Sequence, residues 1–213
     1  DVLAKTLKKY IEFNKLSELV KGNSPTLMVG AVNVLSGDFA IFNSKASHPE
    51  FGISVDALLA SAAVPELFRA VRIGKGLYWD GLFSQNPPIR GFLSGHGSRD
   101  AKPDEIWVIQ INPETRSSEP KSANDIDDRR NELAGNLSLN QELFFVRQTN
   151  DWLHKKWLTA DHLKHVEIRH IALEMELDYP SKLDRSPDFI NALLAEGRSK
   201  GSEFLGKLPK AKP

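Results

Sequence analysis

The sequence contains no cysteine among its 213 residues. Disulfide bonds, thiol nucleophiles and cysteine-based metal sites are therefore excluded. An excess of charge of one sign is also lacking, because 28 lysines and arginines balance 28 aspartates and glutamates. A chain without net charge offers no electrostatic basis for binding nucleic acid. Nucleic acid is accordingly not an expected partner.

Long apolar runs and targeting signals are missing as well. No apolar stretch approaches the ~18 residues that a membrane-spanning helix needs, and no basic-then-apolar signal peptide opens the chain. We expect a cytoplasmic location with at most peripheral contact with a membrane. With 40% hydrophobic and 26% charged residues, the composition is that of a soluble globular chain, long enough for one compact domain or a large piece of one. A chain that starts with Asp1 rather than Met is consistent with processing, trimming or partial disorder.

Patterns typical of helices and strands alternate along the sequence. The first half begins with an expected amphipathic helix over residues 1–20, with Asp1 as N-cap and Gly22 beyond its end, followed by a hairpin of strands 26–34 and 39–42 and a small-residue helix over 55–63. The second half is expected to contain a strand over 105–111, a polar surface loop over 114–128, a long helix over 127–158, a strand from 166 and a final helix over 188–208. In the strand from 166, a bulge or bend is expected between Ile168 and Ile171. This alternation predicts an α/β layered domain, with three layers as the expected arrangement.

The most informative stretch covers residues 78–88. A β-prone segment over residues 70–79 ends on Asp80, Gly81 follows at once, and the chain leaves through a polar loop that contains two prolines. A carboxylate at the end of a strand is a common way of presenting a reactive side chain. An Asp-Gly pair on its own, however, is an ordinary turn signal.

The surroundings of Asp80 give that pair more weight. Residues 61–68 end a small-residue helix with the pattern Ser-Ala-x-x-Pro…Phe, and an Asn-Pro follows Asp80-Gly81 at residues 86–87. This block resembles the C-terminal half of the patatin-like phospholipases, a family of acyl hydrolases. The hairpin over residues 27–38 and the helical segment 130–136 resemble further parts of the same family. The resemblance implies a three-layer α/β/α patatin-like fold, with residues 1–213 as the C-terminal part of a single domain.

The resemblance also implies a chemistry. In the family, a serine on a strand-to-helix elbow attacks an ester carbonyl, a single aspartate takes the serine proton, and a glycine-rich loop holds the oxyanion. The resemblance assigns the general-base role to Asp80 and a close backbone approach to Gly81, and it implies no cofactor and no metal. Leu82 is a departure, because family members carry glycine or alanine at this third position.

The nucleophile of the family has no counterpart in this chain. The family's glycine-rich segment and Gly-x-Ser-x-Gly elbow lie N-terminal to everything present here. One match occurs, from Gly197 through Ser199 to Gly201, but it lies inside a helical pattern and after Asp80, so we interpret it as a chance match. The resemblance therefore implies a partner, an N-terminal polypeptide of the same precursor that carries the serine. Strands 27–34 and 106–111 are apolar on both faces, as in a sheet that is covered on both sides.

Two functions remain open on the sequence. The first is hydrolysis of a lipid or other ester, with Asp80 supplied by this chain. The second is a non-catalytic lipid-binding or scaffold domain that kept the fold.

The remaining motifs have structural interpretations. We expect His162 and His165 to be a solvated pair rather than a metal site. The glycines at 74–76 and 91–97 indicate turns, because the Gly-Lys-Ser/Thr ending of a phosphate loop is missing. Trp152 and Trp157 are predicted to pack against the core rather than to contact a membrane.

Overall fold

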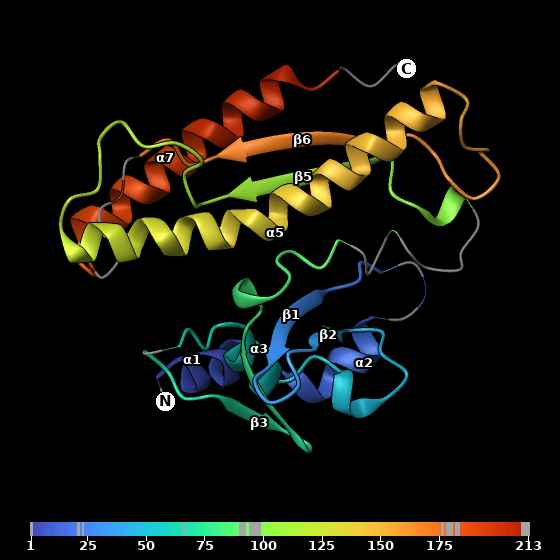
Figure 1. Ribbon diagram of the computed structural model, residues 1–213. Coiled ribbons are helices and arrows are strands. Elements are labelled where there is room, and N and C mark those ends of the chain that lie inside the picture. The colour runs from blue at the N-terminus through green and yellow to red at the C-terminus, as the bar shows by residue number, and fades with distance from the viewer. Residues whose placement is uncertain are drawn as a thin grey trace. The chain divides into compact units, whose positions relative to one another are not determined.

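The fold contains a four-stranded sheet and a two-stranded sheet, one in each of two units of the chain (Figure 1). The computed structural model describes residues 2–20, 22, 24–65, 67–89, 93, 99–175, 177, 181 and 184–209, apart from the side chains of residues 17 and 19. Unit 1 consists of Asp1–Gly97 with Ser138–Glu142, and unit 2 consists of Ser98–Leu137 with Leu143–Pro213.

The beginning of unit 1 is helical but interrupted. Its elements are α1 (Val2–Tyr10), the 3-10 turn η1 (Phe13–Lys15) and α2 (Leu16–Leu19). The single helix predicted over residues 1–20 is therefore wrong, because Glu12 leaves the helical region with φ −85° and ψ 81°. Four of the five residues at positions 10–14 are Tyr, Ile, Phe and Asn, types that favour a helix only weakly. The predicted N-cap, Asp1, lies outside the described residues.

The sheet of unit 1 is antiparallel throughout. Its strands are β1 (Met28–Asn33), β2 (Phe39–Asn43), β3 (Val71–Ile73) and β4 (Gly76–Asp80), in the spatial order β2-β1-β4-β3. The predicted hairpin of β1 and β2 is confirmed. The turn predicted around residues 74–76 is confirmed too, and it joins β3 to β4 through Gly74, whose φ of +55° favours glycine.

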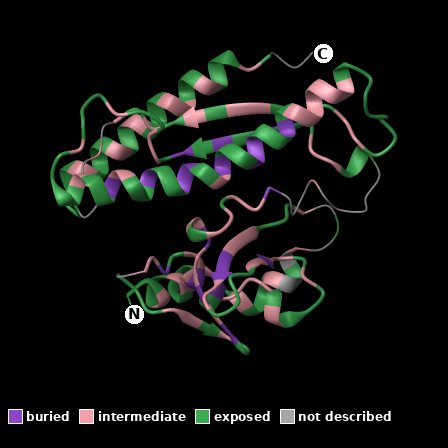
Figure 2. Cartoon of the chain, in the orientation of Figure 1, coloured by how far each residue is buried: buried purple, intermediate pink, exposed green. Residues whose placement is uncertain are grey.

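A small-residue helix packs on this sheet. The helix α3 (Val55–Ser61) contacts β1, β3 and β4, and its Ala57 and Ala60 are completely buried. Short side chains let the helix approach the strands closely. The larger core residues lie on the sheet, where the rings of Phe42 and Tyr78 meet edge to face at 5.6 Å between centroids. Figure 2 colours the buried positions of the chain purple, and some of them lie in the interior of unit 1.

Unit 2 is built around two parallel strands. β5 (Glu105–Gln110) pairs with β6 (Glu167–Ala172) residue for residue over six positions, and α5 (Ala123–His154) connects them along the chain. The bulge predicted between Ile168 and Ile171 is therefore wrong. Both faces of β6 contact a helix, through His170 with α5 and through packing against α7 (Pro187–Lys207). Apolar side chains can thus lie on either face without a slip in the strand.

The long helix α5 begins earlier and ends earlier than the predicted 127–158. The hydroxyl of Ser122 accepts a hydrogen bond from the Asp125 backbone N–H, and the Asp125 carboxylate accepts one from the Ser122 N–H, which forms a capping box. The buried stripe of Leu139, Leu143 and Val146 agrees with the prediction. Trp157, by contrast, lies beyond the helix with 69% of its surface exposed, so its predicted core packing is wrong.

Helices contact both faces of β5. Ile106, Val108 and Gln110 are buried, and the Gln110 side-chain amide donates to Asn136 Oδ1 of α5 at 3.2 Å. On the opposite face, the ring of Trp107 meets Phe204 of α7 at 4.9 Å between centroids. The predicted α/β class is confirmed, while a three-layer arrangement of the whole chain stays a prediction.

The remaining 3-10 turns are η2 (Pro49–Phe51), η3 (Gly81–Phe83) and η4 (Arg99–Ala101). Among the described helices, none combines the length and the apolar character that crossing a bilayer requires.

Candidate functional site

Asp80 is the last residue of β4 in unit 1. It lies opposite Ala31 of β1 in the antiparallel ladder, and its backbone N–H donates to the carbonyl of Ala63 at 3.1 Å. Ala63 is buried in the turn that follows α3. The end of α3 and the end of β4 are thus joined by a backbone hydrogen bond, which explains why the small-residue ending and the Asp-Gly pair occur together in the sequence.

Among the described residues, the Asp80 carboxylate has one hydrogen-bond donor and no cationic partner. Its Oδ1 accepts from the backbone N–H of Leu82 at 2.9 Å, which caps the turn η3. None of the described lysine, arginine or histidine side chains forms an ion pair with it. Burial raises the pKa of the Asp80 carboxyl, and the Leu82 hydrogen bond lowers it by less. A carboxylate with raised proton affinity and no bound cation can accept a proton from a neighbouring hydroxyl.

Gly81 is buried where two backbone segments approach closely. A Cβ atom added at this position would lie 3.0 Å from the carbonyl carbon and oxygen of Gly30 and 3.2 Å from the ring of Phe39. A side chain there would push η3 away from β1 and would move Asp80 with it. Leu82 occupies the middle of the same turn, where its backbone N–H serves Asp80 and its side chain is half-buried.

The Gly-x-Ser-x-Gly match does not form an elbow. Residues 197–201 lie within the continuous helix α7 of unit 2, without the strand-to-helix turn that exposes such a serine. The interpretation of Ser199 as a chance match is therefore confirmed. In the described part of the chain, no serine hydroxyl donates a hydrogen bond to Asp80.

The other motifs that the sequence singled out bring no metal ligands together. His165 Nε2 lies 3.4 Å from Glu167 Oε2, and no group of three or more histidine, aspartate or glutamate side chains among the described residues could hold a metal ion. Of the glycine segment 91–97, only Leu93 is described, so the predicted turn there lies outside the described residues.

Unit 2 contains a charged cluster that was not predicted from the sequence. The polar loop after β5 is tied to α5, because the Arg116 guanidinium donates to both carboxylate oxygens of Glu132 at 2.8 and 3.0 Å and to Asp128 at 2.5 Å. These hydrogen bonds, chiefly those to Glu132, raise the pKa of Arg116. A signal was present, since Asp128 and Glu132 are four residues apart and share one helix face.

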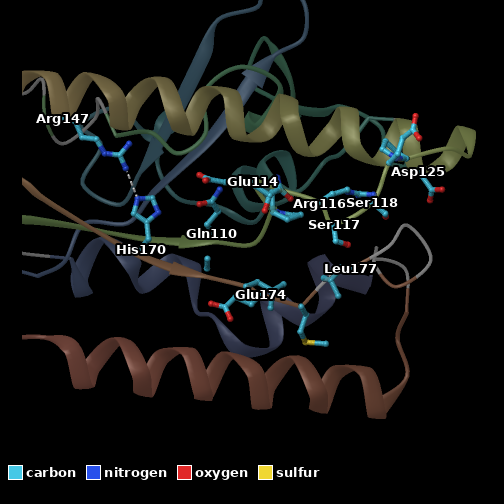
Figure 3. A pocket seen from close by; sticks show the side chains of 18 residues that line it. Gln110, Glu114, Arg116, Ser117, Ser118, Asp125, Arg147, His170, Glu174 and Leu177 are labelled. Atoms are coloured by element: carbon cyan, nitrogen blue, oxygen red, sulfur yellow. Dashed lines mark hydrogen bonds between the residues drawn. The ribbon is translucent and has the colours of Figure 1, made fainter.

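A cavity of about 920 Å³ lies beside this loop, also within unit 2 (Figure 3). Its lining includes Gln110, Arg147 and His170, and Asp80 does not take part in it. These lining residues could not be predicted from the sequence, because they are polar side chains scattered over β5, α5 and β6.

Comparison with known proteins gives one finding for the segment that contains Asp80. A family model described as patatin-like phospholipase matches residues 1–93, a range that includes the whole block from 61 to 86. Residues 94–213 lie outside the match, so the likeness of segment 130–136 stays a prediction. No curated protein matches the chain. Over its first 93 residues, this chain is similar to the patatin-like phospholipases.

Proposed function

We propose that this protein is a lipid acyl hydrolase in which Asp80 is the general base. The observation that carries the proposal is the Asp80 carboxylate itself, which is partly buried, unpaired with any described cation and fixed at a strand end. It lies within the segment that matches the patatin-like phospholipase model. A three-layer α/β/α fold of the complete domain is part of the same proposal.

The reaction follows from the position of this base. Asp80 removes the proton of a serine hydroxyl while the serine oxygen attacks the ester carbonyl, and the leaving alcohol takes that proton as the acyl-serine forms. Water then attacks the acyl-serine, again with Asp80 as base, and the carboxylic acid is released. The hydrogen bond from Leu82 holds the carboxylate in one orientation through both steps.

The serine is supplied, in this proposal, by a companion N-terminal polypeptide that carries Gly-x-Ser-x-Gly. Exposed apolar side chains support a large partner interface: Ile109 of β5 is 76% exposed, and Val2 and Tyr10 of α1 are 82% and 73% exposed. Residues 1–213 expressed alone should be insoluble or molten and inactive on esters, and co-expression with the companion should restore activity. A soluble and active preparation of this chain by itself would contradict the proposal that a companion polypeptide supplies the serine.

The proposed base is tested by Asp80→Asn in the complete protein. Asparagine keeps the shape and removes the basic charge, so turnover of a p-nitrophenyl ester should fall by about 10²-fold or more. Ser199→Ala serves as the matched control and should leave turnover unchanged, because Ser199 lies within α7. Wild-type turnover by Asp80→Asn would rule out the assignment.

A non-catalytic lipid-binding or scaffold role is the second candidate. It is favoured by the observation that no serine hydroxyl of the described residues donates to Asp80. Binding of lipid vesicles by the complete protein without any release of fatty acid would support this role over hydrolysis. Release of fatty acid that depends on Asp80 would exclude it.

A further inference from the structure

The cavity of unit 2 has the size and position of a small-molecule site. Its volume of about 920 Å³ falls within the range of ligand pockets in proteins. Its walls include the residues that follow β5, from Asn112 onward, and those that follow β6, from Leu173 onward, together with side chains of β5, β6 and α5. The carboxyl ends of parallel strands are where α/β sheets bind ligands, because the loops that leave the strands meet there.

One wall of this cavity is held in place by α5. Arg129 Nη2 donates to the carbonyl of Glu114 at 2.7 Å, and Asn136 Nδ2 donates to the carbonyl of Pro113 at 3.0 Å. Arg116 adds its hydrogen bonds to Glu132, a residue that is only 1% exposed. Since the loop is bound to the helix through residues 113, 114 and 116, the cavity is preformed by the fold.

Two donor side chains meet in this cavity from different elements. Arg147 extends from α5 toward His170 of β6, and the figure shows the two side chains pointing at each other (Figure 3). Arg147 Nη2 lies 3.4 Å from His170 Nε2. Of the described carboxylates, none lies within ion-pair distance of Arg147, in contrast to Arg116. Burial and the neighbouring Arg147 lower the pKa of His170.

We propose that this cavity binds a phosphate group, free or as part of a lipid headgroup, between Arg147 and His170. A guanidinium presents parallel N–H donors that fit two phosphate oxygens, and a nearby imidazole adds a further donor when it is protonated. A bound dianion would favour protonation of His170 and would then attract both side chains. The proposal does not depend on the role of Asp80, which lies in unit 1.

The other charged side chains that line the cavity differ in whether they have a partner and in whether they act on His170. Several have partners of their own: Arg116 with Glu132 and Asp128, Asp125 with Ser122, and Glu174 with Lys200. Glu119, also in the lining, is exposed and lies 4.0 Å from Lys121. Glu114 raises the pKa of His170 and is therefore the group that opposes an anion at this position. Removal of the Glu114 charge should therefore strengthen phosphate binding.

Isothermal titration calorimetry on the complete protein tests the proposal, with inorganic phosphate and glycerol 3-phosphate as separate probes. Arg147→Gln should weaken binding by about 10-fold or more, and Glu114→Gln should strengthen it by about 3-fold. Arg130→Gln is the matched control, because Arg130 is an exposed arginine of the same helix that pairs with Asp127. Asp80→Asn should also bind phosphate normally, so the failure of either proposal is recognised separately.

NMR of the histidine side chains provides a second measurement, the change in the pKa of His170 when phosphate is added. If Arg147 had only a structural role, phosphate would not change this pKa. Phosphate should raise the pKa of His170 and should leave the resonances of the exposed His165, which does not line the cavity, in place. Binding of inorganic phosphate supports a free phosphate ligand, and binding of glycerol 3-phosphate alone supports a headgroup. If neither probe binds, or if Arg147→Gln binds as the wild type does, the proposal is overturned.

Discussion

A partly buried carboxylate in unit 1, Asp80, and a fully buried one in unit 2, Glu132, have opposite surroundings. Asp80 in unit 1 accepts one backbone hydrogen bond and faces no described cation, so burial raises its pKa. Glu132 in unit 2 is 1% exposed and bound by two arginines, Arg116 at 2.8 Å and Arg129 at 3.2 Å. Asp80 can therefore accept a proton, but its burial lowers the stability of the fold. Glu132 holds the loop after β5 on α5.

The difference shows how burial alone fails to distinguish a reactive carboxylate from a structural one. Removing a carboxylate from water is unfavourable in both places. In unit 2 the arginines offset that cost, and Glu132 becomes part of the architecture. In unit 1 the cost is left uncompensated by charge, and such uncompensated groups cluster at functional sites. The same substitution, carboxylate to amide, should therefore have opposite effects on stability in the two units.

The largest effect is expected for Glu132→Gln. The amide leaves the partly buried Arg116 and Arg129 without their shared counter-charge, and breaking a buried ion pair from one side costs about 3–5 kcal/mol. Urea unfolding followed by tryptophan fluorescence would measure the loss. Glu119→Gln is the control and should unfold as the wild type does, since Glu119 is 79% exposed and only 4.0 Å from Lys121. Equal midpoints for both variants would mean that the buried cluster contributes nothing.

An intermediate effect is expected for Gly81→Ala. The new Cβ would lie 3.0 Å from the Gly30 carbonyl, and such overpacking costs about 1–3 kcal/mol. Ester turnover should fall as well, because η3 carries the orientation of Asp80.

The matched change in unit 2 is Gly201→Ala, where no heavy atom lies within 4 Å of the added Cβ. Within the helix α7 this change should stabilise the protein by about 0.5–1 kcal/mol. Thermal unfolding and ester turnover are measured for Gly81→Ala and Gly201→Ala. If only Gly81→Ala is impaired, the cause is the close backbone approach at Gly81 and not a general intolerance of alanine in place of glycine. Loss of activity in Gly201→Ala would instead support a nucleophile elbow at residues 197–201.

The smallest effect is expected for the stability of Asp80→Asn. In the unfolded chain the carboxyl titrates near its ordinary pKa of 3.8, and in the folded chain its pKa is higher. The folded state thus holds the proton more tightly, and the stability gained in this way is complete below the unfolded pKa and lost as pH rises through the folded pKa. Asparagine removes this loss, so the Tm of the variant should exceed that of the wild type near neutral pH.

Repeating the melts at lower pH tests the sign of this effect. The difference in Tm should shrink as the pH approaches the unfolded pKa, because both proteins are then uncharged at this position. A Tm below that of the wild type near neutral pH would show that the Asp80 carboxylate stabilises the fold, and its contrast with Glu132 would disappear.

Local signals in the sequence predicted much of the secondary structure. The hairpin of β1 and β2, the turn at Gly74, the helix α3 and the helix α7 follow from strand-forming residues, turn residues and capping residues within a few positions of each other. The position of Asp80 at a strand end was predicted for the same reason. The start of α5 was missed because the capping box at Ser122 uses an aspartate at the position where glutamate is the usual signal.

Sequence by itself determined which segments form strands and helices and where a strand ends on an acidic residue, because those features depend on neighbours in the chain. Only the tertiary structure decided which carboxylate meets a cation. Arg116 reaches Glu132 and Arg147 reaches His170 across 16 and 23 residues of sequence, and no pattern of short period encodes such pairs. The raised pKa of Asp80 is likewise a consequence of packing, since burial depends on segments that fold together from distant parts of the chain.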